Sequence, residues 1–118
     1  MIGKFVWAAV PFAEGDGRYK IRPALVIAQA EMGDEKVFLL APRYSAADKC
    51  KGGNEVVMDS DDAIRVGLDH EGVLRFNREH IVAVKAKDIR NVLCGIDRLS
   101  ARKAEAIRLA ARRLGCNL

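Results

Sequence analysis

The chain has 118 residues, half of them hydrophobic, and a formal net charge of +4. This length fits a single domain over residues 1–118 and is too short for two separate cores. No apolar run is long enough to cross a bilayer, and the first residues lack the long apolar segment of a signal peptide, so we expect a cytoplasmic protein with no membrane partner.

The basic residues are concentrated near the C-terminus. Residues 85–118 carry 9 Lys and Arg against 3 Asp and Glu, whereas residues 1–84 carry 11 against 13. Such a basic segment fits a polyanion or an acidic protein partner, but it fits a solvated helix face equally well.

Neither the cysteines nor the histidines have the spacing of a metal site. Cys50, Cys94 and Cys116 are far apart, which is typical of reduced thiols. His70 and His80 are ten residues apart, with no Cys or His at a ligand spacing from either. We therefore expect no metal and no cofactor.

Short apolar segments separated by turn signals predict six strands. They cover residues 5–12, 20–29, 36–41, 55–58, 73–77 and 81–84. Glycine and charged residues predict loops over 13–19 and 42–53, and the acidic residues 59–62 lead to a turn at Gly67. This pattern predicts a mainly β fold, a small and strongly curved antiparallel sheet or barrel.

A C-terminal helix is predicted over about residues 100–114. Ser100 is a suitable N-cap, and Gly115 follows the last predicted turn. An apolar stripe at helical spacing consists of Ala104, Ile107, Ala111 and Leu114.

The second predicted strand is apolar on both faces. Alternation places Leu25 and Ile27 on one face and Ala24, Val26 and Ala28 on the other. Either the barrel and the helix cover both faces, or a second subunit covers one of them.

Arg22 precedes Pro23 at the start of this strand. The residue before a proline is restricted to extended geometry, and proline fixes its own φ angle. Arg22 is therefore attached to a stiff strand entrance, where its guanidinium could bind a phosphate. A strand start with a solvated arginine is the alternative interpretation.

Three segments in order resemble the MazF/PemK toxins of type II toxin–antitoxin modules. They are "KIRPALVIA" after a Gly/Asp loop, an "APxxS" loop, and "GL" followed by "VLRFNREHI" and a helix. The resemblance implies an SH3-like barrel with a C-terminal helix, a homodimer, and an endoribonuclease (mRNA interferase) that cleaves single-stranded RNA at short sequences without a metal. It also implies a cognate antitoxin as the protein partner.

The resemblance also implies roles for individual residues. Arg22 matches the arginine that stabilises the scissile phosphate, Ser45 matches the second residue of a Thr-Ser pair, and Arg75 matches a catalytic arginine. Tyr44 stands at the first position of the Thr-Ser pair, and Asn77 replaces an aspartate. An amide can position groups but cannot act as a general base near neutral pH.

The identity of the residue that transfers protons is therefore left open by the sequence. His80, next to Glu79, is the first candidate, and we expect His70 to be a surface loop residue. For RNA binding we expect Tyr19, Lys20 and Arg43, beside the two loops, and Tyr44 as a ring that stacks on unpaired bases.

Trp7, in the middle of an apolar segment, is predicted to be in the core.

The sequence leaves two other functions open. A non-catalytic relative that only binds RNA or antitoxin is favoured by Tyr44 and Asn77. A gyrase-directed toxin of the CcdB type is disfavoured, because the chain ends in Cys116-Asn117-Leu118 rather than Trp-Gly-Ile.

Overall fold

The computed structural model describes residues 1–11, 17–45 and 54–118. Its strands are β1 (Lys4–Pro11), β2 (Tyr19–Met32), β3 (Glu35–Ser45), β4 (Glu55–Met58), β5 (Gly72–Arg75), β6 (Val82–Lys85) and β7 (Ile89–Gly95). Two α-helices, α1 (Ser60–Val66) and α2 (Ala101–Arg112), and three short 3₁₀ helices, η1 (Arg78–His80), η2 (Ala86–Asp88) and η3 (Ile96–Arg98), complete the described part.

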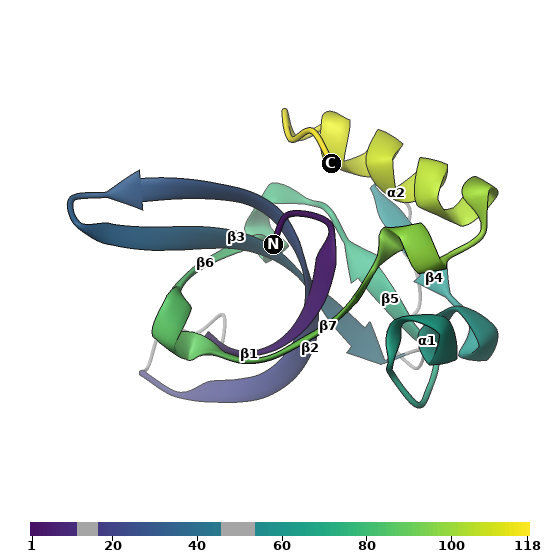
Figure 1. Ribbon diagram of the computed structural model, residues 1–118, viewed down its shortest axis with the longest axis horizontal. Coiled ribbons are helices and arrows are strands. Elements are labelled where there is room, and N and C mark those ends of the chain that lie inside the picture. The colour runs from purple at the N-terminus through teal and green to yellow at the C-terminus, as the bar shows by residue number, and fades with distance from the viewer. Residues whose placement is uncertain (12–16, 46–53) are drawn as a thin grey trace.

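The strands form one strongly curved antiparallel sheet (Figure 1). Their order is β4-β5-β3-β2-β1-β7, and β6 pairs with the first half of β3. The sheet curls round into a small barrel, and α2 lies across one end, near β4. The mainly β, barrel-like fold with a C-terminal helix confirms the predicted fold class.

All six predicted strands are present, with shifted ends. The second and third extend further than predicted, because the β2–β3 hairpin continues to a tight turn at Gly33, whose φ of 67° is left-handed. Residues 42–45, predicted as part of a loop, are instead the end of β3, because they pair with β2 and β5. The rest of that predicted loop, including Cys50, and residues 13–16 of the other predicted loop lie outside the described residues.

Apart from the short 3₁₀ helices, one α-helix and one strand were not predicted. Residues 60–66 form α1, which begins with a capping box between Asp59 and Asp62 and ends at Gly67 in the left-handed region. Residues 89–95 form β7, which pairs with β1. The predicted C-terminal helix is confirmed as α2, and the Ser100 hydroxyl oxygen caps it by accepting from the Lys103 N–H.

The two faces of β2 belong to two apolar clusters within one chain. Leu25 and Ile27 pack with Phe5, Phe76 and Ile107 of α2 in the larger cluster. Ala24 and Val26 lie in the second cluster, inside the barrel, which consists of Val6, Ala8, Val10, Ala24, Val26, Phe38, Leu40 and Val84. The barrel and the helix therefore cover both faces, and the apolar faces of β2 no longer argue for a second subunit.

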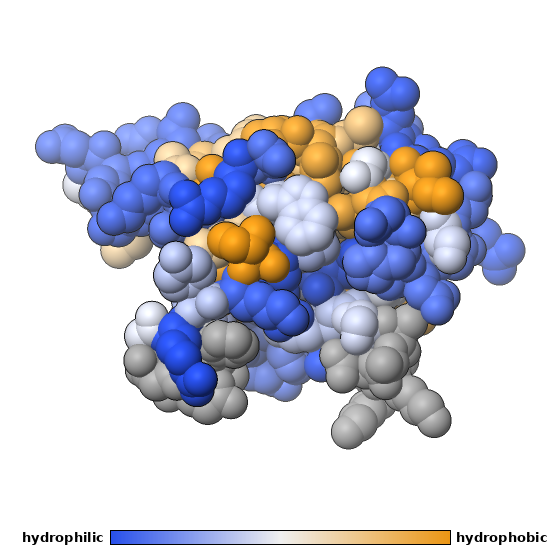
Figure 2. Space-filling model, turned by 90° about the horizontal axis from the view of Figure 1, so that it is seen from below, coloured by the Kyte–Doolittle hydropathy of each residue, from blue (hydrophilic) through white to orange (hydrophobic). Residues whose placement is uncertain are grey.

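No helix in the described part of the chain combines the length and the apolar character that a membrane span requires. On the face seen in Figure 2, hydrophilic side chains cover most of the surface, with separate hydrophobic patches between them.

Candidate functional site

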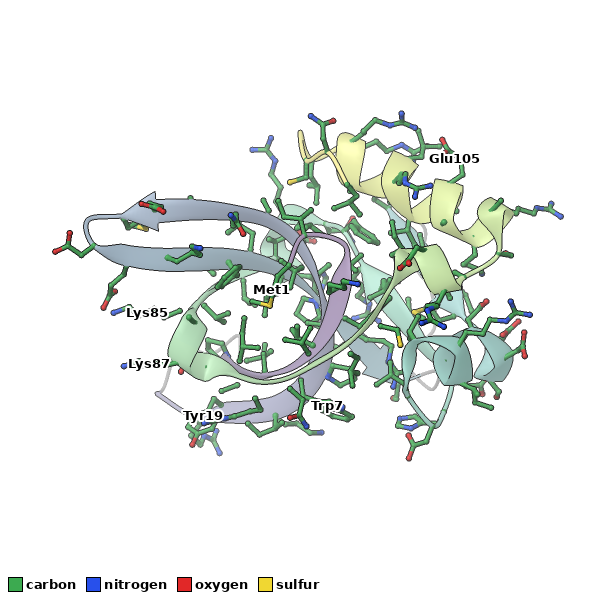
Figure 3. The ribbon with its side chains drawn as sticks, in the orientation of Figure 1. Met1, Trp7, Tyr19, Lys85, Lys87 and Glu105 are labelled. Atoms are coloured by element: carbon green, nitrogen blue, oxygen red, sulfur yellow. The ribbon has the colours of Figure 1, made fainter. Side chains whose placement is uncertain are left out.

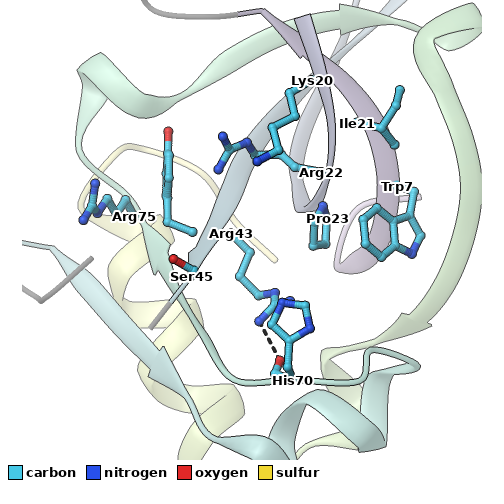
Figure 4. A pocket seen from close by; sticks show the side chains of 10 residues that line it. Trp7, Lys20, Ile21, Arg22, Pro23, Arg43, Ser45, His70 and Arg75 are labelled. Carbon is cyan, nitrogen blue, oxygen red and sulfur yellow. Dashed lines mark hydrogen bonds between the residues drawn. The ribbon is translucent and has the colours of Figure 1, made fainter. Parts of the chain in front are cut away.

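A pocket of about 550 Å³ opens where the start of β2, the end of β3 and the end of β5 meet (Figure 4). It is lined by Trp7, Lys20, Ile21, Arg22, Pro23, Arg43, Tyr44, Ser45, His70 and Arg75. Strand pairing brings these segments together, because β2 pairs with β1 and the last residues of β3 pair with β5. Segments far apart in the sequence thus form a single wall.

The lining is strongly cationic. Lys20, Arg22, Arg43 and Arg75 all face this pocket, and no Asp or Glu is among the lining residues that the structure describes. Ser45 adds a hydroxyl at the exposed end of β3. Such a surface fits an anionic ligand with several oxygen acceptors, of which a phosphate is the simplest.

Tyr44 lies between two of these arginines. The Arg22 Cζ atom is 4.8 Å from the centroid of the Tyr44 ring, and the Arg75 Cζ atom is 4.6 Å from it. Both distances are typical of cation–π contacts, so the Tyr44 ring is engaged by two arginines at once. An RNA base that stacks on Tyr44 would compete with these contacts.

Arg75 is fixed by a carboxylate on the neighbouring strand. Its Nε donates to the Glu55 Oε2 at 3.3 Å, and the Glu55 side chain is only 6% exposed against 17% for Arg75. Because the pair is largely removed from water, the hydrogen bond constrains the direction of the guanidinium.

A second chain of interactions joins Arg43, His70 and Asp69. The Arg43 Nη1 donates to the backbone oxygen of His70 at 2.7 Å, and its Nη2 lies 3.5 Å from the His70 Nε2. The His70 Nδ1 is 2.6 Å from the Asp69 Oδ1. Burial lowers the pKa of Arg43, which Asp69 partly opposes, and the hydrogen bond with His70 lowers the pKa of Asp69.

Gly72 leaves room for this arrangement. A Cβ at this position would lie 2.6 Å from the backbone oxygen of Tyr44 and 2.9 Å from the Arg43 Cζ. The Arg43 side chain can lie against residue 72 of β5 only because this residue has no side chain.

The pocket brings together most of the residues predicted from the sequence. Arg22, Ser45 and Arg75, the three predicted catalytic residues, all line it, and so do Lys20, Arg43 and Tyr44. His80 is not among the lining residues, but its ring makes a T-shaped contact with the Tyr44 ring at a centroid distance of 5.6 Å and an interplanar angle of 75°. Its Nδ1 is buried and has no hydrogen-bond partner in the described part of the chain.

Two predicted residues lie elsewhere. The Asn77 side-chain oxygen accepts from the backbone N–H of Asn54 at 3.3 Å, so this amide joins two chain segments outside the pocket. Tyr19 lines a different hollow with Arg18 and Arg90; Figure 3 labels it at the lower edge of the barrel, to the left of Trp7.

Other residues of the site were missed. Trp7 is half-buried: it packs against the larger apolar cluster, as predicted, and it also lines the pocket, where β1 pairs it with Pro23. His70, expected in a surface loop, also lines the pocket, because Arg43 holds its backbone. No motif in the sequence marks Glu55, whereas Asp69 and His70 are consecutive residues, a pattern that indicates a carboxylate–imidazole contact.

Among residues 1–11, 17–45 and 54–118, no group of three or more His, Cys, Asp and Glu side chains is arranged to hold a metal ion. In comparisons with known proteins, no family model matches the chain, and no curated protein matches it.

Proposed function

We propose that this protein is an endoribonuclease that cleaves single-stranded RNA at short sequences, as the MazF/PemK toxins do. The observation that carries the proposal is the pocket in which Arg22, Arg75 and Ser45 meet around Tyr44. These are the residues to which the resemblance gives catalytic roles, and they come from three different strands. A chance resemblance in short motifs would not require them to share a pocket.

The chemistry of the pocket supports phosphoryl transfer. In cleavage through the ribose 2′-hydroxyl, negative charge increases on the non-bridging oxygens of the phosphate. Arg22 and Arg75 can donate to these oxygens when their guanidinium groups turn from the Tyr44 ring toward the ligand, and Ser45 can add a neutral hydrogen bond. The products would be a 2′,3′-cyclic phosphate and a 5′-hydroxyl, and the proposal includes no metal.

A cleavage assay on a long single-stranded RNA, with EDTA present, tests this proposal. We expect discrete fragments ending in a cyclic phosphate. Arg22→Ala should slow cleavage by roughly 10²–10³, as the loss of one preorganised donor does in other enzymes, and Ser45→Ala should cost less. Intact RNA with wild-type protein, or activity that requires an added divalent ion, would contradict the proposal.

A second candidate function is binding without cleavage. Asn77 replaces the family's aspartate, and its amide is engaged with the Asn54 backbone rather than directed into the pocket. The cationic pocket would then retain RNA or an acidic antitoxin without cutting RNA. Tight RNA binding together with intact RNA in the assay above would favour this candidate.

The proposed protein partners follow from the same resemblance. An acidic antitoxin segment that folds over the pocket would contact Arg22 and Arg75, and charge complementarity would speed its association. Charge reversal at both arginines should weaken this binding.

A homodimer is also proposed, and light scattering that gives the mass of one 13.0 kDa chain at micromolar concentration would contradict it.

A further inference from the structure

The proposed reaction needs a group that removes the proton of the 2′-hydroxyl, and neither Arg22, Arg75 nor Ser45 can do so readily. Asn77, at the position of the family's carboxylate, cannot do so either. A titratable side chain on the wall of the same pocket is therefore required. Among the described lining residues, His70 is the one with an imidazole, the side chain that most often serves as a general base.

The neighbours of His70 determine where its proton sits. The Asp69 carboxylate, 2.6 Å from Nδ1, only accepts hydrogen bonds when it is ionised, so Nδ1 carries the hydrogen. Arg43 only donates, and its Nη2 lies on the Nε2 side of the ring at 3.5 Å. Both neighbours therefore select the neutral tautomer in which Nε2 has a lone pair. The Arg43 contact with this lone pair is long, at 3.5 Å, and Nε2 acts as the base when the 2′-hydroxyl takes the place of Arg43 there.

Arg43 also fixes the chain at this point. It is only 4% exposed, its Nη1 bonds to the His70 backbone oxygen, and its buried Nε has no hydrogen-bond partner in the described part of the chain. Burying a guanidinium in this way is costly, and its described hydrogen-bond partners are both on His70. A function that depends on the position of His70 would explain why the free-energy cost of burying Arg43 is retained.

We propose that His70 is the general base of the RNA cleavage reaction and that Asp69 and Arg43 are its positioning residues; this inference rests on the proposed function. The 2′-O–H bond breaks and its proton moves to the His70 Nε2. The O2′–P bond forms, the P–O5′ bond breaks, and the departing 5′ oxygen takes a proton from water. Asp69 from the same loop and Arg43 from β3 are the described charged groups that face the ring.

The test is the single-turnover cleavage rate of full-length protein between pH 5 and 8, with the binding of an uncleavable RNA, 2′-deoxy at the scissile position, measured in parallel. In the wild type we expect the rate to rise with pH as the imidazole loses its proton. His70→Ala should lower the rate roughly 10²–10⁴-fold, remove this rise, and leave RNA binding within a few-fold of wild type. Added imidazole should restore part of the rate.

Two further variants separate positioning from general damage. Asp69→Asn should slow cleavage, because an amide can donate to Nδ1 and so favour the other tautomer. Glu71→Gln makes the same chemical change two residues away and should leave the rate unchanged. If His70→Ala is destabilised, His70→Gln, which has no base but keeps a polar end, carries the same expectation.

The outcomes distinguish this inference from the function on which it rests. If wild-type protein leaves RNA uncut, the proposed nuclease activity fails, and the inference fails with it. If wild-type protein cleaves RNA and His70→Ala keeps its rate and pH profile, only the inference is overturned. The same holds if the pH-dependent rise disappears in His80→Ala but persists in His70→Ala.

Discussion

Glu55 and Arg75 face each other across β4 and β5, and the Arg75 Nε donates a hydrogen bond to the Glu55 carboxylate at 3.3 Å. The carboxylate is almost buried, so it orients the guanidinium that covers one face of Tyr44 without itself lining the pocket. The direction of a cation at the site is thus determined by a residue that a ligand need not touch.

Removing the charge of Glu55 should therefore affect the reaction. Glu55→Gln keeps the size of the side chain but weakens the charge-assisted hydrogen bond, so Arg75 loses its fixed direction. We expect cleavage to slow by roughly 10-fold or more, since small misplacements of positioned groups are costly. Single-turnover rates measure this effect.

Glu105→Gln provides the matched control. Glu105 pairs with Arg112 on the surface of α2, where both side chains are more than half exposed. The same substitution there should leave the rate unchanged. Equal rates for Glu55→Gln and wild-type protein would show that Arg75 does not depend on its buried partner.

Tyr44 is expected to act on the arginines rather than on a base. Tyr44→Phe keeps an aromatic ring between Arg22 and Arg75 and should be tolerated, whereas Tyr44→Ala frees both guanidinium groups and should weaken RNA binding. Cation–π contacts of this kind contribute about 0.5–2 kcal/mol each. RNA affinity in a double-mutant cycle with Arg22→Ala measures the coupling.

If the ring acts through Arg22, the effect of Tyr44→Ala should be smaller when Arg22 is already alanine. If the ring instead stacks on RNA, the loss of affinity should be the same in both backgrounds. The second result would restore base stacking as the role of Tyr44.

Gly72→Ala should disturb the pocket from below. Its Cβ would lie 2.6 Å from the Tyr44 backbone oxygen and 2.9 Å from the Arg43 Cζ, so strand β5 or Arg43 must move. We expect a stability loss of about 1–3 kcal/mol from overpacking, measured by denaturant unfolding, together with slower cleavage at a temperature where the variant is folded.

Gly33→Ala is the comparison. Gly33 has a left-handed φ of 67°, but its Cβ would meet nothing within 4 Å. It should lose stability through backbone strain alone and cleave RNA at the wild-type rate. If the Gly33→Ala variant cleaves RNA slowly and the Gly72→Ala variant cleaves it at the wild-type rate, the Arg43 contact is not important for the site.

Asp59 should make stability depend on pH. The Asp62 N–H donates to its carboxylate at 2.8 Å, and this hydrogen bond is the main cause that lowers the pKa of Asp59 from 3.8. Because the folded pKa lies below the unfolded one, the contribution is complete above about pH 4 and is lost as the pH falls through the folded pKa.

Melting temperatures at several pH values check this expectation. Asp59→Ala should be less stable than wild type at pH 7, and the difference should shrink below about pH 4. Asp59→Asn, which can still cap α1, should retain most of the stability at pH 7. A difference between Asp59→Ala and wild type that is constant from pH 7 to pH 2 would contradict the assignment.

The sequence predicted the elements whose own residues determine them. Alternating apolar residues predicted the barrel strands, and Ser100 with its apolar stripe predicted α2. It did not predict α1, whose seven residues depend on the caps at Asp59 and Gly67 rather than on an apolar stripe. β7 was also missed, because its residues are mostly exposed or half-buried and give no clear alternation.

The site shows the same limit. Arg22 and Arg75 could be proposed from local motifs, but Glu55 is twenty residues from Arg75 in the sequence. Only the pairing register of β4 and β5 makes them neighbours, and a single sequence does not determine that register. His70 is a surface loop residue, as expected, but its place in the pocket lining could not be predicted, since the buried Arg43 that bonds to its backbone oxygen comes from a different strand.

β3 both forms part of the barrel and contributes three residues to the wall of the pocket. Residues Val37 to Leu40 pair with β6, and Arg43 to Ser45 pair with β5. Side chains alternate along a strand, so a slip of one residue against β5 would turn Arg43 out of its buried place and direct Tyr44 inward. The pairing register of the β2–β3 hairpin thus determines the directions of three side chains at the end of β3. An insertion or deletion in the part of β3 that pairs with β6 would therefore abolish the site without changing any residue that lines it.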